Sequence, residues 1–312
     1  MTRVAQRDAT AELRRVVVRG GPKEDRVFVV KILVTGASGM LGRDLVSHLQ
    51  ARHDVIGCDL EVDITQPEMV GRFISEIRPE AIIHCAAWTD VDGAEASEAA
   101  ALAVNGAGAG NVAAAAARVD ARLVVVSTDY VFDGSGQTDY REDAPTSPIG
   151  AYGRTKLAGE HAATAAHPGG VRIARTAWLY GRNGRNFVDT MLRVGAERGV
   201  VDVVADQLGC PTWTRDLAPA LEALIDLPAG VYHTAGAGSV TWAGFAEAIF
   251  AEAGVDCEVR NIRTAELGRP AHRPARSVLA VTNAEGPRLR PWREALRDYI
   301  RSAHQAAEVQ TG

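Results

Sequence analysis

A run of apolar residues near the start of the chain leads directly into a glycine-rich turn. The run, VFVVKILVTG at 27–36, has the length and β-branching of a buried parallel strand. It continues into Gly36, Gly39 and Gly42, in GxxGxxG spacing, and then into a helical pattern. In such a turn the first glycine permits the tight bend, the second lets backbone approach a pyrophosphate, and the third allows close helix–strand packing. Because a helix N-terminus also attracts phosphates, the turn predicts a dinucleotide site that includes Met40 and Leu41.

The segments after this turn alternate between apolar strands and helical patterns. Further strands are expected at 54–59, 81–87 and 122–128. Helices are expected near 40–51, 67–77 and 97–118, and from about Tyr152 onward. Continuous apolar strands separated by helices indicate a parallel sheet that is covered on both faces. The sequence therefore predicts an α/β fold with a doubly wound, Rossmann-like parallel sheet.

The regular alternation weakens after about residue 175. Segments 201–206 and 230–236 have the pattern of later strands that return to the sheet. Helices are expected near 187–198, 214–226, 241–253 and 291–304. We expect these helices to form a smaller lobe over the carboxyl ends of the strands, where open α/β sheets bind ligands. The predicted organisation is a disordered extension at 1–26, a dinucleotide-binding domain at 27–175, a mainly substrate-binding lobe at 176–305 and a tail at 306–312.

Composition excludes several classes of function. The formal net charge of -5 argues against a general nucleic-acid binder, which should be basic. We find no apolar run of the roughly 18 residues that a membrane span needs, and no apolar core of a secretory signal. The four cysteines are scattered without a CxxC pair, so neither a disulfide framework nor a metal site is predicted. We therefore expect a reduced, cytoplasmic protein.

Two side chains compete for the expected adenosine ribose. Asp59 ends the second strand, where an acid commonly holds the ribose hydroxyls of NAD, while Arg43 follows the third glycine and suits the 2′-phosphate of NADP. The pair Asp63-Ile64 lies further along and is expected to cover the adenine. The coenzyme is therefore NADPH or NADH, and we expect use of both with a modest preference for NADPH.

A tyrosine and a lysine stand one helical turn apart in Tyr152-Gly153-Arg154-Thr155-Lys156. Lysine is rare in this chain, whose 34 basic residues include only three lysines, so this one is conspicuous. An ammonium near a phenol is expected to lower the pKa of the tyrosine toward neutrality, which would let it protonate a carbonyl oxygen as a hydride reaches the carbon. Ser127-Thr128 ends the strand before this helix and offers a hydroxyl to orient that carbonyl.

Together these motifs resemble the extended short-chain dehydrogenases/reductases, and within them the dTDP-4-dehydrorhamnose reductase family. The resemblance runs from Lys31 to about Tyr299. It rests on the glycine turn, the helix around Asn105 and seven further stretches, which are STDYVFDG at 127–134, YGRTKLAGE at 152–160, RTAWLYG at 175–181, NFVDTMLR at 186–193, DQLGCPT at 206–212, GVYH at 230–233 and RP at 273–274 with Ser277. The family departs from this chain in usually having Gln at the place of Met40 and Tyr or His at the place of Trp88.

The resemblance implies roles for individual residues. Thr128, Tyr152 and Lys156 form the implied catalytic set, and Ala86, Ala87 and Thr89 flank the cofactor ribose. The implied substrate contacts are Val131, Phe132, Trp178, Asn186 and Phe187. Four arginines cluster before the last helix, and of these Arg273 is the one we favour for the nucleotide pyrophosphate.

The implied activity is reduction of the C4 keto group of a dTDP-4-keto-6-deoxysugar, in deoxysugar biosynthesis. Some members use magnesium at a dimer contact, for which Asp44 is the candidate here, so magnesium and a homodimer both stay open. A 4,6-dehydratase is disfavoured, because it needs an Asp-Glu pair after the Ser/Thr and this chain reads Asp129-Tyr130. An NAD-dependent C4 epimerase and a non-catalytic, dinucleotide-binding regulatory subunit remain as alternatives.

Overall fold

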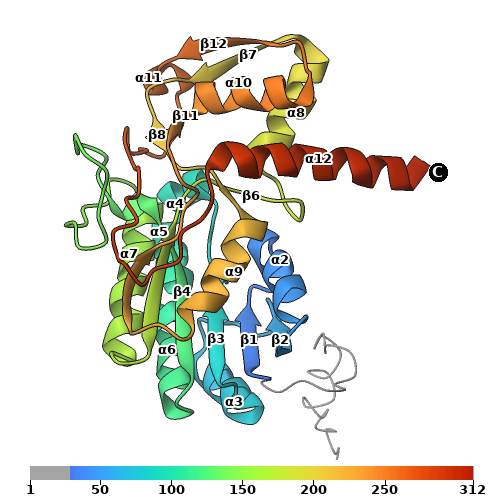
Figure 1. Cartoon of the computed structure of the whole chain (residues 1–312). Helices are drawn as coiled ribbons and strands as arrows, with labels where there is room; N and C mark the ends of the chain where they lie inside the picture. Colours follow the sequence, from blue (N-terminus) through green and yellow to red (C-terminus); the bar gives the residue numbers. More distant parts are fainter. Residues whose placement is uncertain (1–28, 312) are drawn as a thin grey trace, which may run out of the picture.

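The computed structural model describes residues 29–311, with side chains up to residue 302 in the C-terminal helix. The extension expected at 1–26 lies outside these residues. Figure 1 shows a sheet flanked by helices below and a smaller lobe above, with the C-terminal helix extending to one side. The α/β fold with a doubly wound parallel sheet is confirmed.

The main sheet has six strands in the order β2-β1-β3-β4-β5-β10, and all neighbours are parallel. Its strands are β1 (Lys31–Thr35), β2 (Asp54–Cys58), β3 (Ala81–His84), β4 (Arg122–Thr128), β5 (Val171–Thr176) and β10 (Gly230–His233). The chain runs outward from β1 to β2 and then crosses back to β3 on the other side of β1. Ligands of open α/β sheets bind at such a reversal, beyond the carboxyl ends of the strands.

Helices cover both faces of this sheet. One face packs on α2 (Met40–Leu49) and α9 (Thr214–Leu224), and the other on α3 (Pro67–Ile77), α6 (Ala109–Arg118) and α7 (Ala151–Ala166). Before α6 the chain forms α4 (Val91–Ala96), α5 (Glu98–Leu102) and a π-helical turn (Ala103–Gly108). A short 3₁₀ turn, η2 (Asp129–Val131), follows β4. The two apolar layers arise because the central strands are buried on both sides.

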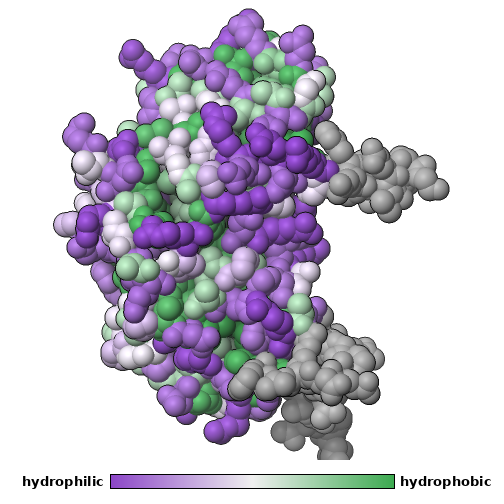
Figure 2. All heavy atoms as spheres, viewed as in Figure 1, coloured by the Kyte–Doolittle hydropathy of each residue, from purple (hydrophilic) through white to green (hydrophobic). Residues whose placement is uncertain are grey.

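The lobe has a separate core built from α8 (Phe187–Arg198), α10 (Trp242–Ala253) and α12 (Trp292–Thr311). Its short elements are α11 (Thr264–Leu267) and the strand pairs β6 (Leu179–Tyr180) with β9 (Thr212–Trp213), β7 (Val200–Val204) with β12 (Glu258–Ile262), and β8 (Leu208–Gly209) with β11 (Val240–Thr241). Viewed as in Figure 1, the surface is mostly hydrophilic, and hydrophobic residues reach it in small separate patches (Figure 2).

The structure corrects four expectations about the second half of the chain. The strand expected at 201–206 does not return to the main sheet, because β7 pairs with β12 inside the lobe. The helix expected at 214–226 in the lobe instead packs against α2 on the main sheet. Strand β5 was not anticipated, although 230–236 does join the sheet beside it through β10. The last helix continues to Thr311, so the predicted tail at 306–312 is largely helical.

One helical stretch, Glu98–Arg118, is long and apolar enough to cross a membrane by length and composition alone, contrary to the expectation that the chain contains no such run. Half of its most apolar window is buried inside the fold. There its last segment, α6, packs between α3 and α7. This placement is that of a core helix.

Candidate active site

A cavity of about 1050 Å³ lies beyond the carboxyl ends of the central strands. It extends from the glycine turn after β1 to the start of α10 in the lobe. Most residues that the sequence selects line it, namely Gly36, Gly39, Met40, Leu41, Gly42, Asp59, Asp63, Ile64, Ala86, Ala87, Thr89, Thr128, Tyr152, Lys156 and Trp178. The fold therefore brings the phosphate turn, the catalytic candidates and one aromatic side chain to a single space.

The glycine turn has no room for side chains. Gly36 has a left-handed backbone (φ +67°), and a Cβ on it would lie 2.7 Å from the backbone nitrogen of Ala86. A Cβ on Gly42 would lie 2.1 Å from the carbonyl oxygen of Gly36. Gly39 is the N-cap of α2 and contributes no side-chain cap, so the N–H groups of the first turn face the cavity without a side-chain acceptor. This cradle fits the pyrophosphate of a dinucleotide.

The two side chains expected at the adenosine ribose, Asp59 and Arg43, both bind the backbone of Ser38 in the glycine turn. The backbone N–H of Ser38 donates to the Asp59 carboxylate (2.8 Å), and the Arg43 side chain donates to the Ser38 carbonyl (2.9 Å). Asp59 lines the cavity, whereas Arg43 is exposed and lies outside its lining. The contact through Ser38 keeps the guanidinium beside the turn.

Tyr152 and Lys156 lie on the first turns of α7, and Thr128 ends the neighbouring strand β4. The Lys156 ammonium is buried and donates to the carbonyl oxygen of Val126 (2.7 Å). Burial lowers the pKa of Lys156 to about 8, against the opposing effect of Glu160. The three side chains thus converge on one wall of the cavity.

The pKa of Tyr152 differs from the expected one. Burial, together with the charge of Asp129, raises the pKa of Tyr152 to about 12, while a hydrogen bond with Thr128 lowers it. The sequence predicts a tyrosine acidified by lysine, and the structure corrects this, because burial of the phenol raises its pKa by more than the Thr128 hydrogen bond lowers it. Tyr152 therefore keeps its proton at neutral pH, as a proton donor must.

The structure separates the two hydroxyls of Ser127-Thr128. Ser127 donates to the buried carboxylate of Glu160 (2.5 Å), which also pairs with Arg175 (2.7 Å). The Thr128 hydroxyl instead lies beside Asp129 (3.0 Å) on the side of Tyr152. Of the two, Thr128 is therefore the hydroxyl positioned beside the tyrosine.

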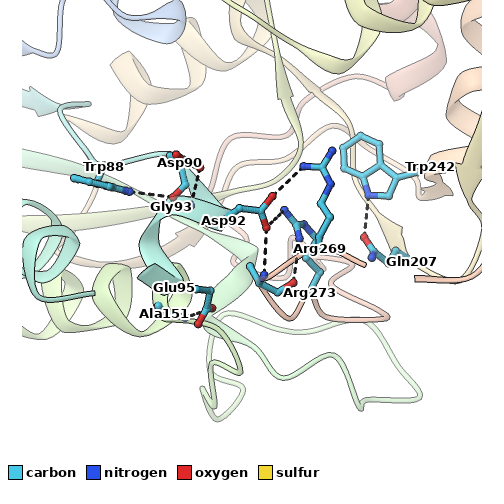
Figure 3. A network of polar contacts seen from close by, with 11 residues as sticks. Trp88, Asp90, Asp92, Gly93, Glu95, Ala151, Gln207, Trp242, Arg269 and Arg273 are labelled. Carbon is cyan, nitrogen blue, oxygen red and sulfur yellow. Dashed lines mark hydrogen bonds and ion pairs between the residues drawn. The ribbon is translucent and has the colours of Figure 1, made fainter. Parts of the chain in front are cut away.

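Several cavity residues were missed by sequence reasoning, and two of them come from the lobe side of the cavity. Trp242 begins α10 and stacks face to face on Trp178, with ring centroids 3.6 Å apart and planes 4° apart. Its indole N–H donates to Gln207 (3.1 Å), which fixes the ring (Figure 3). Arg185 is exposed at the edge of the cavity, next to Gly184. No local motif marks either residue, because both reach the cavity only through the packing of the lobe.

Besides Arg273, four of the expected substrate contacts lie outside the cavity lining. Val131 and Phe132 are fully buried, and Phe132 stacks on Tyr140 with centroids 4.2 Å apart. Asn186 caps α8 by accepting from the N–H of Asp189 (3.0 Å). Phe187 packs against Trp242, with centroids 4.6 Å apart, and so stands behind the aromatic wall.

Arg273 is engaged with a carboxylate of the nucleotide-binding half. Its guanidinium donates to Asp92 of α4 (3.0 Å), to which Arg269 also donates (3.1 Å). Figure 3 shows both arginines pointing toward Asp92 from the C-terminal loop. Arg273 lies outside the cavity lining. The ion pair ties this loop to α4.

The magnesium candidate Asp44 is likewise engaged within the chain. Its carboxylate accepts from Asn183 (3.1 Å) and from Thr214 (2.5 Å), and so joins α2 to the segments before α8 and at the start of α9. Within residues 29–302 no group of three or more His, Cys, Asp or Glu side chains is arranged to hold a metal ion.

Comparisons with known proteins agree with this geometry. The family described as RmlD substrate binding domain matches residues 30–305. A dTDP-4-dehydrorhamnose reductase of Streptomyces griseus is 46% identical over 278 residues, covering 85% of this chain and 91% of the relative. A probable dTDP-4,6-dihydroxy-2-methyloxan-3-one 4-ketoreductase of Streptomyces antibioticus is also 46% identical, over 85% of this chain and 93% of the relative. The crystal structure of a Bacillus anthracis dTDP-4-dehydrorhamnose reductase in complex with NADP has a TM-score of 0.85 at 39% identity, and covers 88% of this chain and all of its own.

Proposed function

The chain belongs to the family of the RmlD substrate binding domain, and from this premise we propose that it is a reductase of nucleotide-activated keto-sugars. The reaction is NAD(P)H-dependent reduction of the C4 keto group of a dTDP-4-keto-6-deoxysugar, such as dTDP-4-dehydrorhamnose. The observation that carries the proposal is the convergence of Thr128, Tyr152 and Lys156 in a cavity that also contains the glycine turn. Relatives of this activity support it at 46% identity over most of the chain.

In the proposed reduction, different residues of this chain donate the proton, orient the carbonyl and hold the coenzyme. When bound, NADPH or NADH supplies the hydride. Tyr152 holds a proton at its phenol oxygen and donates it to the carbonyl oxygen of the sugar. Thr128 aligns that carbonyl by a hydrogen bond. Lys156 would hold the ribose next to the nicotinamide, and Trp178 forms the apolar wall of the sugar site.

The residues expected beside the adenosine ribose support use of both NADH and NADPH. Asp59 suits the free ribose hydroxyls of NADH, whereas Arg43 beside the turn suits the extra phosphate of NADPH. The bound NADP of the Bacillus anthracis relative favours NADPH as the preferred one.

The division of labour follows the two cores of the molecule. We assign dinucleotide binding mainly to residues 27–175 and sugar binding mainly to 176–305, with α9 and β10 serving the first half although they lie in the second. All four cysteines are free thiols, which supports a reducing, cytoplasmic location. A homodimer is part of the proposal and is tested by light scattering of the purified chain.

The proposal is tested with purified protein and a dTDP-4-keto-6-deoxyhexose. We expect one reduced nicotinamide to be oxidised for each sugar nucleotide converted. Conversion without net oxidation, with NAD retained on the protein, would instead indicate a C4 epimerase. Binding of the coenzyme without any turnover would indicate a regulatory subunit.

A further inference from the structure

The hydroxyl of Thr128 is already committed within the protein. Its Oγ1 donates to the Asp129 carboxylate (3.0 Å) and accepts from the backbone N–H of Tyr130 (3.2 Å). A hydroxyl has one hydrogen to donate, so in this arrangement Thr128 has none left for a carbonyl in the cavity. The role proposed for Thr128 therefore depends on the state of Asp129.

Asp129 is a buried carboxylate without a cationic partner. It is 2% exposed, and Ser277 of the C-terminal loop donates to its second oxygen (2.5 Å). Among the described residues no lysine, arginine or histidine forms an ion pair with it. Burying an unpaired charge is costly, so such a group tends to take up a proton.

The groups around Asp129 do not supply a positive charge that pairs with its carboxylate. Three neutral groups face it, and burial raises the pKa of each, namely Tyr130 on η2, Tyr152 on α7 and Cys210 after β8. The nearby cations are engaged elsewhere. Lys156 donates to Val126, Arg273 to Asp92 and Arg276 to Asp139.

We propose that Asp129 is a positioning residue that sets the direction in which the Thr128 hydroxyl donates. With Asp129 ionised, Thr128 donates to the carboxylate. With Asp129 neutral, its carboxyl donates to Thr128 Oγ1, and the threonine hydrogen turns to the carbonyl in the cavity. The oxygen of Thr128 then accepts two hydrogen bonds and donates one, which is its full capacity. The Asp129 carboxylate takes up one proton from solvent when it becomes neutral, and the threonine hydrogen only changes its acceptor.

This inference rests on the proposed function and predicts how the rate of turnover depends on pH. Burial raises the pKa of Asp129 to about 7, against the opposing hydrogen bonds from Ser277 and Thr128. The carboxyl is neutral below this pKa, so the competent arrangement is present at lower pH and is lost as the pH rises through about 7. We expect kcat/KM for the sugar to fall by about tenfold per pH unit above that point.

Two variants test this predicted pH profile of kcat/KM. Asp129→Asn is neutral at every pH and its amide can donate to Thr128, so its profile should lose the fall near neutrality. Ser277→Ala removes a hydrogen bond that favours the carboxylate, so the fall should move to higher pH. A purely structural role for Asp129 would lower the melting temperature of either variant but leave the shape of the profile unchanged. The same profile in the parent and both variants would overturn the inference.

A second measurement does not use turnover. Infrared difference spectra between the parent and Asp129→Asn should contain a protonated-carboxyl stretch that disappears as the pH rises through about 7. If that band titrates but the parent never oxidises NADPH, the proposed function is overturned while the protonation of Asp129 is upheld. If the parent turns over and the band does not titrate, the inference about Asp129 is overturned and the function stands.

Discussion

The two walls of the cavity are built in different ways. The wall that carries the glycine turn, Tyr152 and Lys156 is made by the short turn between β1 and α2 and by the first turns of α7, so the spacing of its residues follows from local backbone structure. The opposite wall is made by Trp178 and Trp242, which lie far apart in the chain and meet only through packing. The first wall therefore depends on the backbone of the turn and of one helix, and the second depends on contacts between distant segments of the chain.

The largest effect should come from Tyr152→Phe. The phenylalanine ring keeps the packing but has no proton to donate, so kcat should fall by about 10²–10⁴-fold. Coenzyme affinity, measured by quenching of protein fluorescence, should stay close to that of the parent. Turnover equal to that of the parent would show that Tyr152 is not the proton donor.

Gly42→Ala should act on the wall that contains the glycine turn. The added Cβ would meet the Gly36 carbonyl at 2.1 Å, so the turn must open and the coenzyme KM should rise by at least about tenfold, with a lower melting temperature. Gly169→Ala is the matched control, because a Cβ at Gly169 meets nothing within 4 Å. Similar coenzyme KM values in the two variants would mean that the turn does not form the phosphate cradle.

Trp242→Ala should act on the other wall. Trp178 loses the ring that supports it, and an aromatic pair contributes about 0.5–1.5 kcal/mol beyond its buried area. We therefore expect the KM for the sugar nucleotide to rise by about two- to tenfold while the coenzyme KM is unchanged. Trp242→Phe should lie between the parent and the alanine variant. A rise confined to the coenzyme KM would contradict this division between the walls.

Arg43→Ala should have the smallest effect. The side chain is exposed, and an exposed charge contact contributes about 0.2–1 kcal/mol, so the KM for NADPH should rise by no more than about fivefold. The KM for NADH, measured in the same preparation, should change less. Equal changes for both coenzymes would show that Arg43 does not touch the 2′-phosphate.

The nucleotide-binding wall could be predicted from sequence because its signals are local. A glycine that must adopt φ +67°, as Gly36 does, and a tyrosine one helical turn before a lysine are visible in a few consecutive residues. The expected cavity lining on this side agrees with the structure for all but Arg43.

The features that could not be predicted from the sequence depend on contacts between residues far apart in the chain. Strand β5 contains Arg172 and Arg175, which break the apolar pattern of a buried strand. Both are buried because Arg172 donates to the Leu227 carbonyl (2.7 Å) and Arg175 pairs with Glu160. Likewise the apolar strand β7 gave no sign that its partner would be the polar segment Glu258–Ile262.

The stacked indoles of Trp178 and Trp242 have an optical consequence. Two parallel chromophores only 3.6 Å apart share their excitation, so the pair should give a split band in the circular dichroism spectrum that separated indoles lack. Trp178 lies just after strand β5 of the main sheet, while Trp242 begins a helix of the lobe. The amplitude of that band is therefore a built-in gauge of how closely the two halves of the molecule approach each other, readable without any label.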